Sequence, residues 1–127
     1  MKIFFEKLII NYPYTLAVLL FFIGALIVLN KSNLFKKLIG INIMESSIFI
    51  MFIGGGYIRG AGVPMFNAAH PQPAYINPLP SALMLTGIVV SVSVTAFALA
   101  LILRLYKSYG STDVRQISEM RSEVAEE

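Results

Sequence analysis

Apolar residues fill three long runs of the chain, which are separated by polar or proline-rich segments. The runs cover residues 12–29, 38–57 and 81–103. Each has a length within the range of about 17 to 25 residues that lets a helix cross a bilayer. Pro13 lies near the start of the first run and Pro80 just before the third, where the first turn of a helix tolerates proline. The pattern predicts three transmembrane helices.

The connections between the runs predict the topology. Residues 30–37 include Lys31, Lys36 and Lys37 and no acidic residue, so the positive-inside rule places this polar turn in the cytoplasm. Residues 58–80 contain five of the six prolines and are predicted to form an ordered loop on the outer surface. Three spans then leave the N-terminus outside and the C-terminus in the cytoplasm.

Composition supports a membrane protein. The chain is 57% hydrophobic and 13% charged, against about 45 to 50% and about 25% in ordinary globular domains. We therefore predict an all-α membrane protein, with a three-helix transmembrane domain over residues 1–107. The tail, residues 108–127, is predicted to be hydrophilic and cytoplasmic, either as a short helix or disordered. The basic residues lie at helix ends rather than along one stripe, which argues against a nucleic acid partner.

One glutamate interrupts the second run. Glu45 is the only ionisable residue well inside any of the three runs, and a carboxylate near the bilayer centre costs about 2.5 to 3.5 kcal/mol on insertion scales. Asn42 and Phe49 lie three positions before it and four after it, so all three share one helix face. We predict that Glu45 is a proton or cation relay and Asn42 a polar helper. The alternative is that Glu45 only joins helices by hydrogen bonding.

Small residues follow one face of the third run. Gly87, Ser91, Thr95 and Ala98 are spaced by four, four and three positions. Small residues at this spacing let helix backbones approach closely in a membrane, so this face is predicted to pack against another helix. Ser91 and Thr95 are also candidates for the wall of an ion path.

Other chemistry finds little support in the sequence. The chain has no cysteine, which excludes disulfides and thiolate metal sites. His70 has no second histidine or nearby carboxylate beside it, so it is predicted to be solvated rather than a metal ligand. Gly54-Gly55-Gly56 ends a span and lacks the lysine of a nucleotide-binding loop. We expect no catalytic residues, metal or cofactor in this chain.

The segment Asn77–Ser91, continuing through Val94–Ala96, resembles the "DPLPQALVLTAIVIS…VTA" signature of the C subunits of Mrp-type multisubunit sodium/proton antiporters. The resemblance extends from about Leu29 to Lys107. The wider family includes the K subunit of the complex I type of quinone oxidoreductase and the matching subunit of membrane-bound hydrogenases, and Ser118–Arg121 is similar to the end of the K subunit.

The resemblance implies a multi-pass, three-helix subunit of the prokaryotic inner (cell) membrane that binds no cofactor. Its partners would be other membrane subunits of an antiporter-like complex and the lipid bilayer. The K subunit usually carries a glutamate at the position of Asn42 and another in its third helix, whereas here the carboxylate is Glu45 and the third run has none. This difference favours the antiporter or hydrogenase branch. Asn77 and Ser81 replace the usual aspartate and glutamine, so no role is assigned to them.

Several functions follow from these observations. The first is a non-catalytic subunit of an Mrp-type antiporter module that contributes Glu45 to an ion path. The alternative is the equivalent subunit of a membrane-bound hydrogenase or complex I type oxidoreductase, with redox subunits in the same complex. A homodimeric small drug-efflux transporter fits less well, because that family usually has four spans and a glutamate in the first. A purely structural subunit is the remaining possibility.

Overall fold

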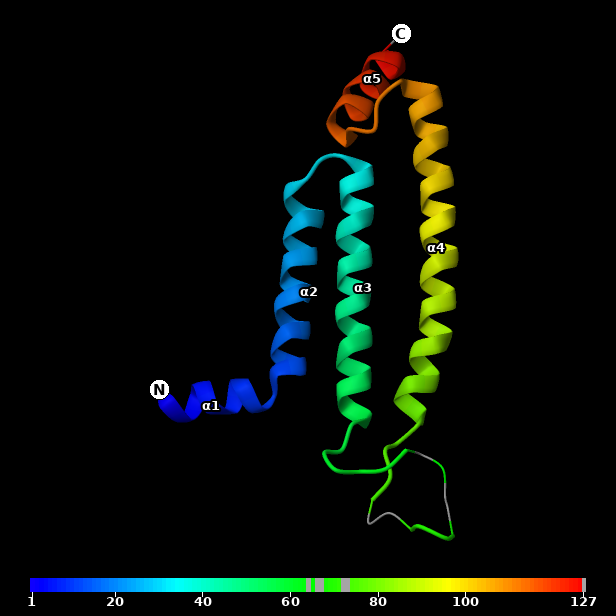
Figure 1. Ribbon diagram of the computed structural model, residues 1–127. Coiled ribbons are helices and arrows are strands. Elements are labelled where there is room, and N and C mark those ends of the chain that lie inside the picture. The colour runs from blue at the N-terminus through cyan, green and yellow to red at the C-terminus, as the bar shows by residue number, and fades with distance from the viewer. Residues whose placement is uncertain (64, 66–67, 72–73, 127) are drawn as a thin grey trace.

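Three long helices form the body of the protein. The computed structural model describes residues 1–63, 65, 68–71 and 74–126, and within these ranges the helices are α1 (Lys2–Ile10), α2 (Tyr12–Asn30), α3 (Leu34–Gly56), α4 (Leu79–Tyr109) and α5 (Val114–Glu126). Among them α2, α3 and α4 are long and apolar enough to cross a membrane. This confirms the three predicted spans. Figure 1 shows α3 between α2 and α4, with α1 turned sideways at one end and α5 folded over the other.

Two helix ends differ from the sequence prediction. Helix α3 begins at Leu34 rather than near residue 38 because the side-chain oxygen of Asn33 caps it, accepting the backbone N–H of Phe35 at 2.9 Å. The polar turn is therefore shorter than residues 30–37. Helix α4 continues past residue 103 to Tyr109 and ends at Gly110, whose φ of 70° suits a left-handed cap. With 31 residues, α4 is about 46 Å long, which exceeds the thickness of about 30 Å of a typical hydrocarbon core.

Helices α2 and α3 cross at two glycines that the sequence pattern did not indicate. A Cβ atom added to Gly24 would lie 2.8 Å from the carbonyl oxygen of Gly40, and one added to Gly40 would lie 2.9 Å from the carbonyl oxygen of Gly24. Ala17 on α2 and Ser47 on α3 are each only 2% exposed. Close backbone contact of this kind stabilises helix pairs in membranes through dispersion forces. It fixes one side of α3 and leaves another side for α4.

The connection between α3 and α4 is tied together near its two ends. The N–H of Gly62 donates to the carbonyl oxygen of Ala74 at 2.9 Å, and the N–H of Ile76 donates to that of Gly62 at 3.1 Å. His70 is exposed, as predicted. The prediction of an ordered loop also covers residues 64, 66–67 and 72–73, which lie outside the described residues.

At the opposite end, the turn between α2 and α3 pairs with the turn between α4 and α5. The N–H of Leu34 donates to the carbonyl oxygen of Thr112 at 2.9 Å, and the N–H of Val114 donates to that of Ser32 at 3.0 Å. The Ser32 hydroxyl also donates to the Asp113 carboxylate at 2.9 Å. These bonds hold the start of α5 against the α2–α3 turn.

This pairing of turns should depend on the charge of Asp113. The hydroxyl of Ser32 and then the backbone N–H of Arg115 lower the pKa of Asp113 from its ordinary value. Because the folded-state pKa is depressed, the pairing is fully stabilised above the ordinary aspartate pKa of about 3.9. We expect it to weaken as the pH falls through the lowered pKa.

At neutral pH, Asp113→Ala should therefore speed hydrogen exchange of the Leu34 and Val114 amides, measured by mass spectrometry. Asp113→Asn mimics the protonated aspartate, because it keeps one side-chain oxygen as a helix cap but loses the charge and the second acceptor. Its exchange should be intermediate between the native protein and the alanine variant. Unchanged exchange in the alanine variant would mean that the backbone bonds alone hold the turns.

Candidate functional site

The intramembrane carboxylate of α3 is hydrogen-bonded to α4. The hydroxyl of Ser91 donates a hydrogen bond to Oε2 of Glu45. Both residues are partly buried, in a part of the chain that otherwise carries no charged side chain. A hydroxyl donor compensates part of the cost of removing a carboxylate from water. Glu45 is therefore directed at the neighbouring helix of the same chain rather than at lipid.

A second polar pair lies one turn away in the same contact. The hydroxyl of Thr95 donates to Oδ1 of Asn42 at 3.0 Å. Asn42 lies three residues from Glu45 on α3, and Thr95 lies four residues from Ser91 on α4. The two pairs are therefore separated by roughly one helical turn, about 5.4 Å. The four predicted ion-path residues thus meet as two adjacent hydrogen-bonded pairs between α3 and α4.

An aromatic contact borders the polar pairs on the side of the α3–α4 connection. The ring of Phe49 packs over Gly87, and a Cβ atom on that glycine would lie 2.6 Å from Cε1 of the ring. Phe49 follows Glu45 by one turn, and Gly87 precedes Ser91 by one turn, as antiparallel helices require. The small face predicted for the third run thus packs on α3 at Gly87, Ser91 and Thr95.

Basic side chains lie far from Glu45 along its own helix. The nearest one on α3 is Lys37, eight residues away, which corresponds to about 12 Å along the axis. The Lys37 ammonium donates to the carbonyl oxygen of Val28 at 2.8 Å, so it is bonded to the end of α2. Within the described residues, the hydrogen-bond partner of the Glu45 carboxylate is therefore a neutral hydroxyl.

The chemistry available to the two pairs is proton transfer or coordination of a hard cation. Serine and threonine hydroxyls both donate and accept hydrogen bonds, and a carboxylate accepts a proton. Carboxylate, amide and hydroxyl oxygens are also ligands for hard cations. The described residues contain no group of three or more His, Asp or Glu side chains that could hold a metal ion.

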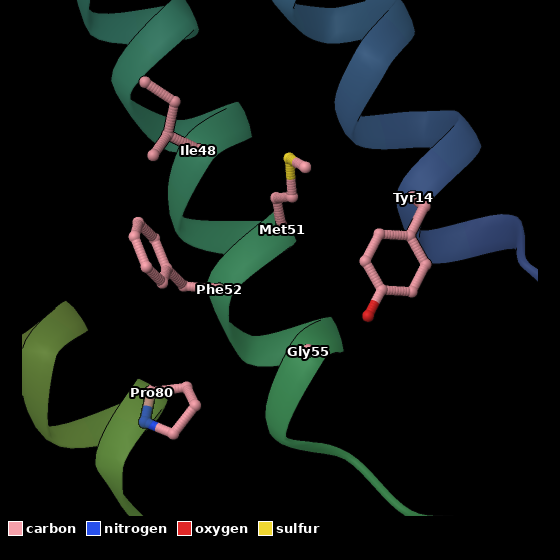
Figure 2. A pocket seen from close by; sticks show the side chains of 6 residues that line it. All are labelled: Tyr14, Ile48, Met51, Phe52, Gly55 and Pro80. Carbon is pink, nitrogen blue, oxygen red and sulfur yellow. The ribbon is translucent and has the colours of Figure 1, made fainter.

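A separate opening near the α3–α4 connection offers no such chemistry. Figure 2 shows its lining side chains from α2, α3 and the start of α4: Tyr14, Ile48, Met51, Phe52, Gly55 and Pro80. Its volume is about 370 Å³. Apart from the Tyr14 hydroxyl these side chains are apolar or absent, which suits lipid tails or a neighbouring helix better than an ion.

Comparison with known proteins assigns the family. Residues 12–122 match the family described as NADH-ubiquinone/plastoquinone oxidoreductase chain 4L. The C1 subunit of the Na(+)/H(+) antiporter of Staphylococcus saprophyticus is 35% identical over 91 residues, covering 72% of this chain and 76% of that protein. The C subunit of the Na(+)/H(+) antiporter of Bacillus subtilis is 31% identical over 102 residues, covering 80% and 88%.

A solved structure agrees with these relatives. One chain of the membrane-bound sulfane sulfur reductase, an archaeal respiratory membrane complex, is 38% identical to this chain and superposes with a TM-score of 0.74, covering 81% of this chain and 94% of that one. The match over most of the chain in both sequence and structure means that the protein belongs to the chain 4L family of NADH-ubiquinone/plastoquinone oxidoreductases, together with the C subunits of Na(+)/H(+) antiporters.

Proposed function

We propose that this chain is a non-catalytic membrane subunit of a multisubunit sodium/proton antiporter and that Glu45 is its contribution to the ion path. The observation that carries the proposal is the Glu45–Ser91 hydrogen bond beside the Asn42–Thr95 pair. An intramembrane carboxylate is costly, and two hydroxyl donors from one helix face hold this polar cluster together. The relatives named as antiporter subunits support the same function.

The proposed orientation places the α2–α3 turn and α5 in the cytoplasm. Five basic residues lie on or beside the ends of α2, α3 and α4 at that end of the molecule: Lys31, Lys36, Lys37, Arg104 and Lys107. Such an excess supports a cytoplasmic position under the positive-inside rule. The N-terminal α1 and the α3–α4 connection would then lie on the outer side of the cell membrane.

A redox-linked complex is the second candidate. It is favoured by the likeness to a chain of the sulfane sulfur reductase, which is a respiratory membrane complex. In that setting the chain would have the same place in the membrane, and electron transfer would belong to other subunits. The family assignment gives no support to a homodimeric drug-efflux transporter.

Mass spectrometry of the complex isolated through this chain in mild detergent tests the proposal. We expect large antiporter-type membrane subunits and no redox protein. Nickel-iron or iron-sulfur subunits in the same particle would favour the redox-linked complex instead. Isolation of the chain alone, or as a free homodimer, would contradict both.

A further inference from the structure

A groove lies where α1, α2 and the end of α3 meet. Its volume is about 620 Å³, within the range of about 300 to 1,000 Å³ that is typical of small-molecule sites. Its inner part is apolar and includes Leu16 on α2 with Ile50 and Ile53 on α3. These side chains belong to the membrane spans, so the inner part lies at the depth of lipid chains.

The outer part of the groove is polar and carries a positive charge. Tyr57 and Arg59 line it just beyond the end of α3. The Arg59 guanidinium donates to the carbonyl oxygen of Ile10 at 2.9 Å, which is a neutral acceptor and not a counter-charge. The described lining residues include no acidic side chain. A guanidinium in this position matches a phosphate group, to which it can donate two parallel hydrogen bonds.

The geometry points to a binding site for one anionic phospholipid, with its phosphate at Arg59 and an acyl chain along Leu16, Ile50 and Ile53. The lining residues change from a cation at the membrane surface to aliphatic side chains within the span. A phospholipid has the matching order of groups, with its phosphate at the surface and its acyl chains within the membrane. Tyrosine beside the cation is typical of the interfacial layer, where an aromatic ring meets headgroups. A transmembrane helix of another subunit would match the apolar part but would leave the guanidinium unpaired.

The lipid would also have a structural effect. Helix α1 is attached to the segment just after α3 through the Arg59–Ile10 hydrogen bond, and α1 runs across the direction of α2 (Figure 1). A lipid with its phosphate at this guanidinium and its acyl chain along Leu16, Ile50 and Ile53 would therefore join α1, α2 and α3 at this end of the bundle. This role is independent of any ion path through Glu45.

Photo-crosslinking in the intact complex tests the site. A benzophenone amino acid replaces Leu16, which is 49% exposed. The complex is then reconstituted in nanodiscs with equal amounts of phosphatidylglycerol and phosphatidylcholine. We expect an adduct enriched in phosphatidylglycerol. Arg59→Gln should reduce that adduct at least about tenfold, as expected for losing a hydrogen bond to a charged group.

Two variants serve as controls. Arg59→Lys keeps the charge but not the paired donors, so it should retain an intermediate yield of the phosphatidylglycerol adduct. Lys7→Gln removes another cation at the same end of the molecule and should leave the yield unchanged. A yield that is equal for both lipids and insensitive to Arg59→Gln would overturn the proposal. So would an adduct with another protein subunit, which would mean that a partner fills the groove.

Discussion

Replacing Glu45 by Gln is expected to reduce sodium-dependent proton movement by the assembled complex by about 10²-fold or more, the scale of losing a positioned acid or base. Glutamine has nearly the same shape and its amide oxygen still accepts the Ser91 hydroxyl, but it neither takes up nor releases a proton. The complex should therefore assemble normally. A pH-sensitive dye in inverted membrane vesicles measures the transport, and size-exclusion chromatography of the solubilised complex measures assembly.

Two further variants separate a relay from a packing residue. Glu119→Gln makes the same chemical change on α5, outside the membrane spans, and should leave transport unchanged. Ser91→Ala removes the donor to the Glu45 carboxylate and should reduce transport by about tenfold with assembly intact, since a hydrogen bond to a charged group contributes about 1.5 to 3 kcal/mol. Full transport in the Glu45→Gln complex would make Glu45 a packing residue. Loss of assembly in that variant alone would indicate that the carboxylate holds the helices together.

The composition of the α3–α4 contact could be predicted from the sequence because helical periodicity determines which residues share a face. The spacing of Asn42 and Glu45, and that of Ser91 and Thr95, is enough to place each pair of residues on one side of its helix. The pairing across the contact could not be predicted. Whether Ser91 meets Glu45 or Asn42 depends on the register of two antiparallel helices, and the packing of Phe49 on Gly87 matches the register that pairs Ser91 with Glu45.

The sequence contains no comparable signal for the contact between α2 and α3. Helix α2 is apolar on all sides, so hydropathy does not indicate which face packs against protein and which faces lipid. Gly24 is a single glycine in that run and has no partner at the four-residue spacing that marks small-residue contacts. The start of α3 is predicted too late in the chain. Residues 30–37 are assigned to the polar turn because of their lysines, whereas Asn33 caps the helix before Lys36 and Lys37.

Substituting Ala for Gly24 or for Gly40 is expected to lower the free energy of unfolding by about 1 to 3 kcal/mol, the usual cost of adding a methyl group to a packed contact. The Cβ atom on Gly24 would lie 2.6 Å from Cγ of Met44, a flexible side chain that can move. It would also lie 2.8 Å from the carbonyl oxygen of Gly40, which moves only if the helices separate. Unfolding in detergent by increasing amounts of sodium dodecyl sulfate, followed by circular dichroism, measures the loss.

Gly55→Ala is the matched control for this prediction. It makes the same substitution in α3, but the nearest atom to the new Cβ is the Tyr14 hydroxyl oxygen at 3.8 Å, an ordinary contact. Alanine is also the better helix former by about 0.8 to 1.0 kcal/mol, so stability should stay equal or rise slightly. The double variant Gly24→Ala/Gly40→Ala should cost less than the sum of the single changes, because the two added methyl groups relieve the same contact when the helices separate. If Gly24→Ala proved as stable as Gly55→Ala, the two helices would have to lie farther apart at Gly24 and Gly40 than the structure places them.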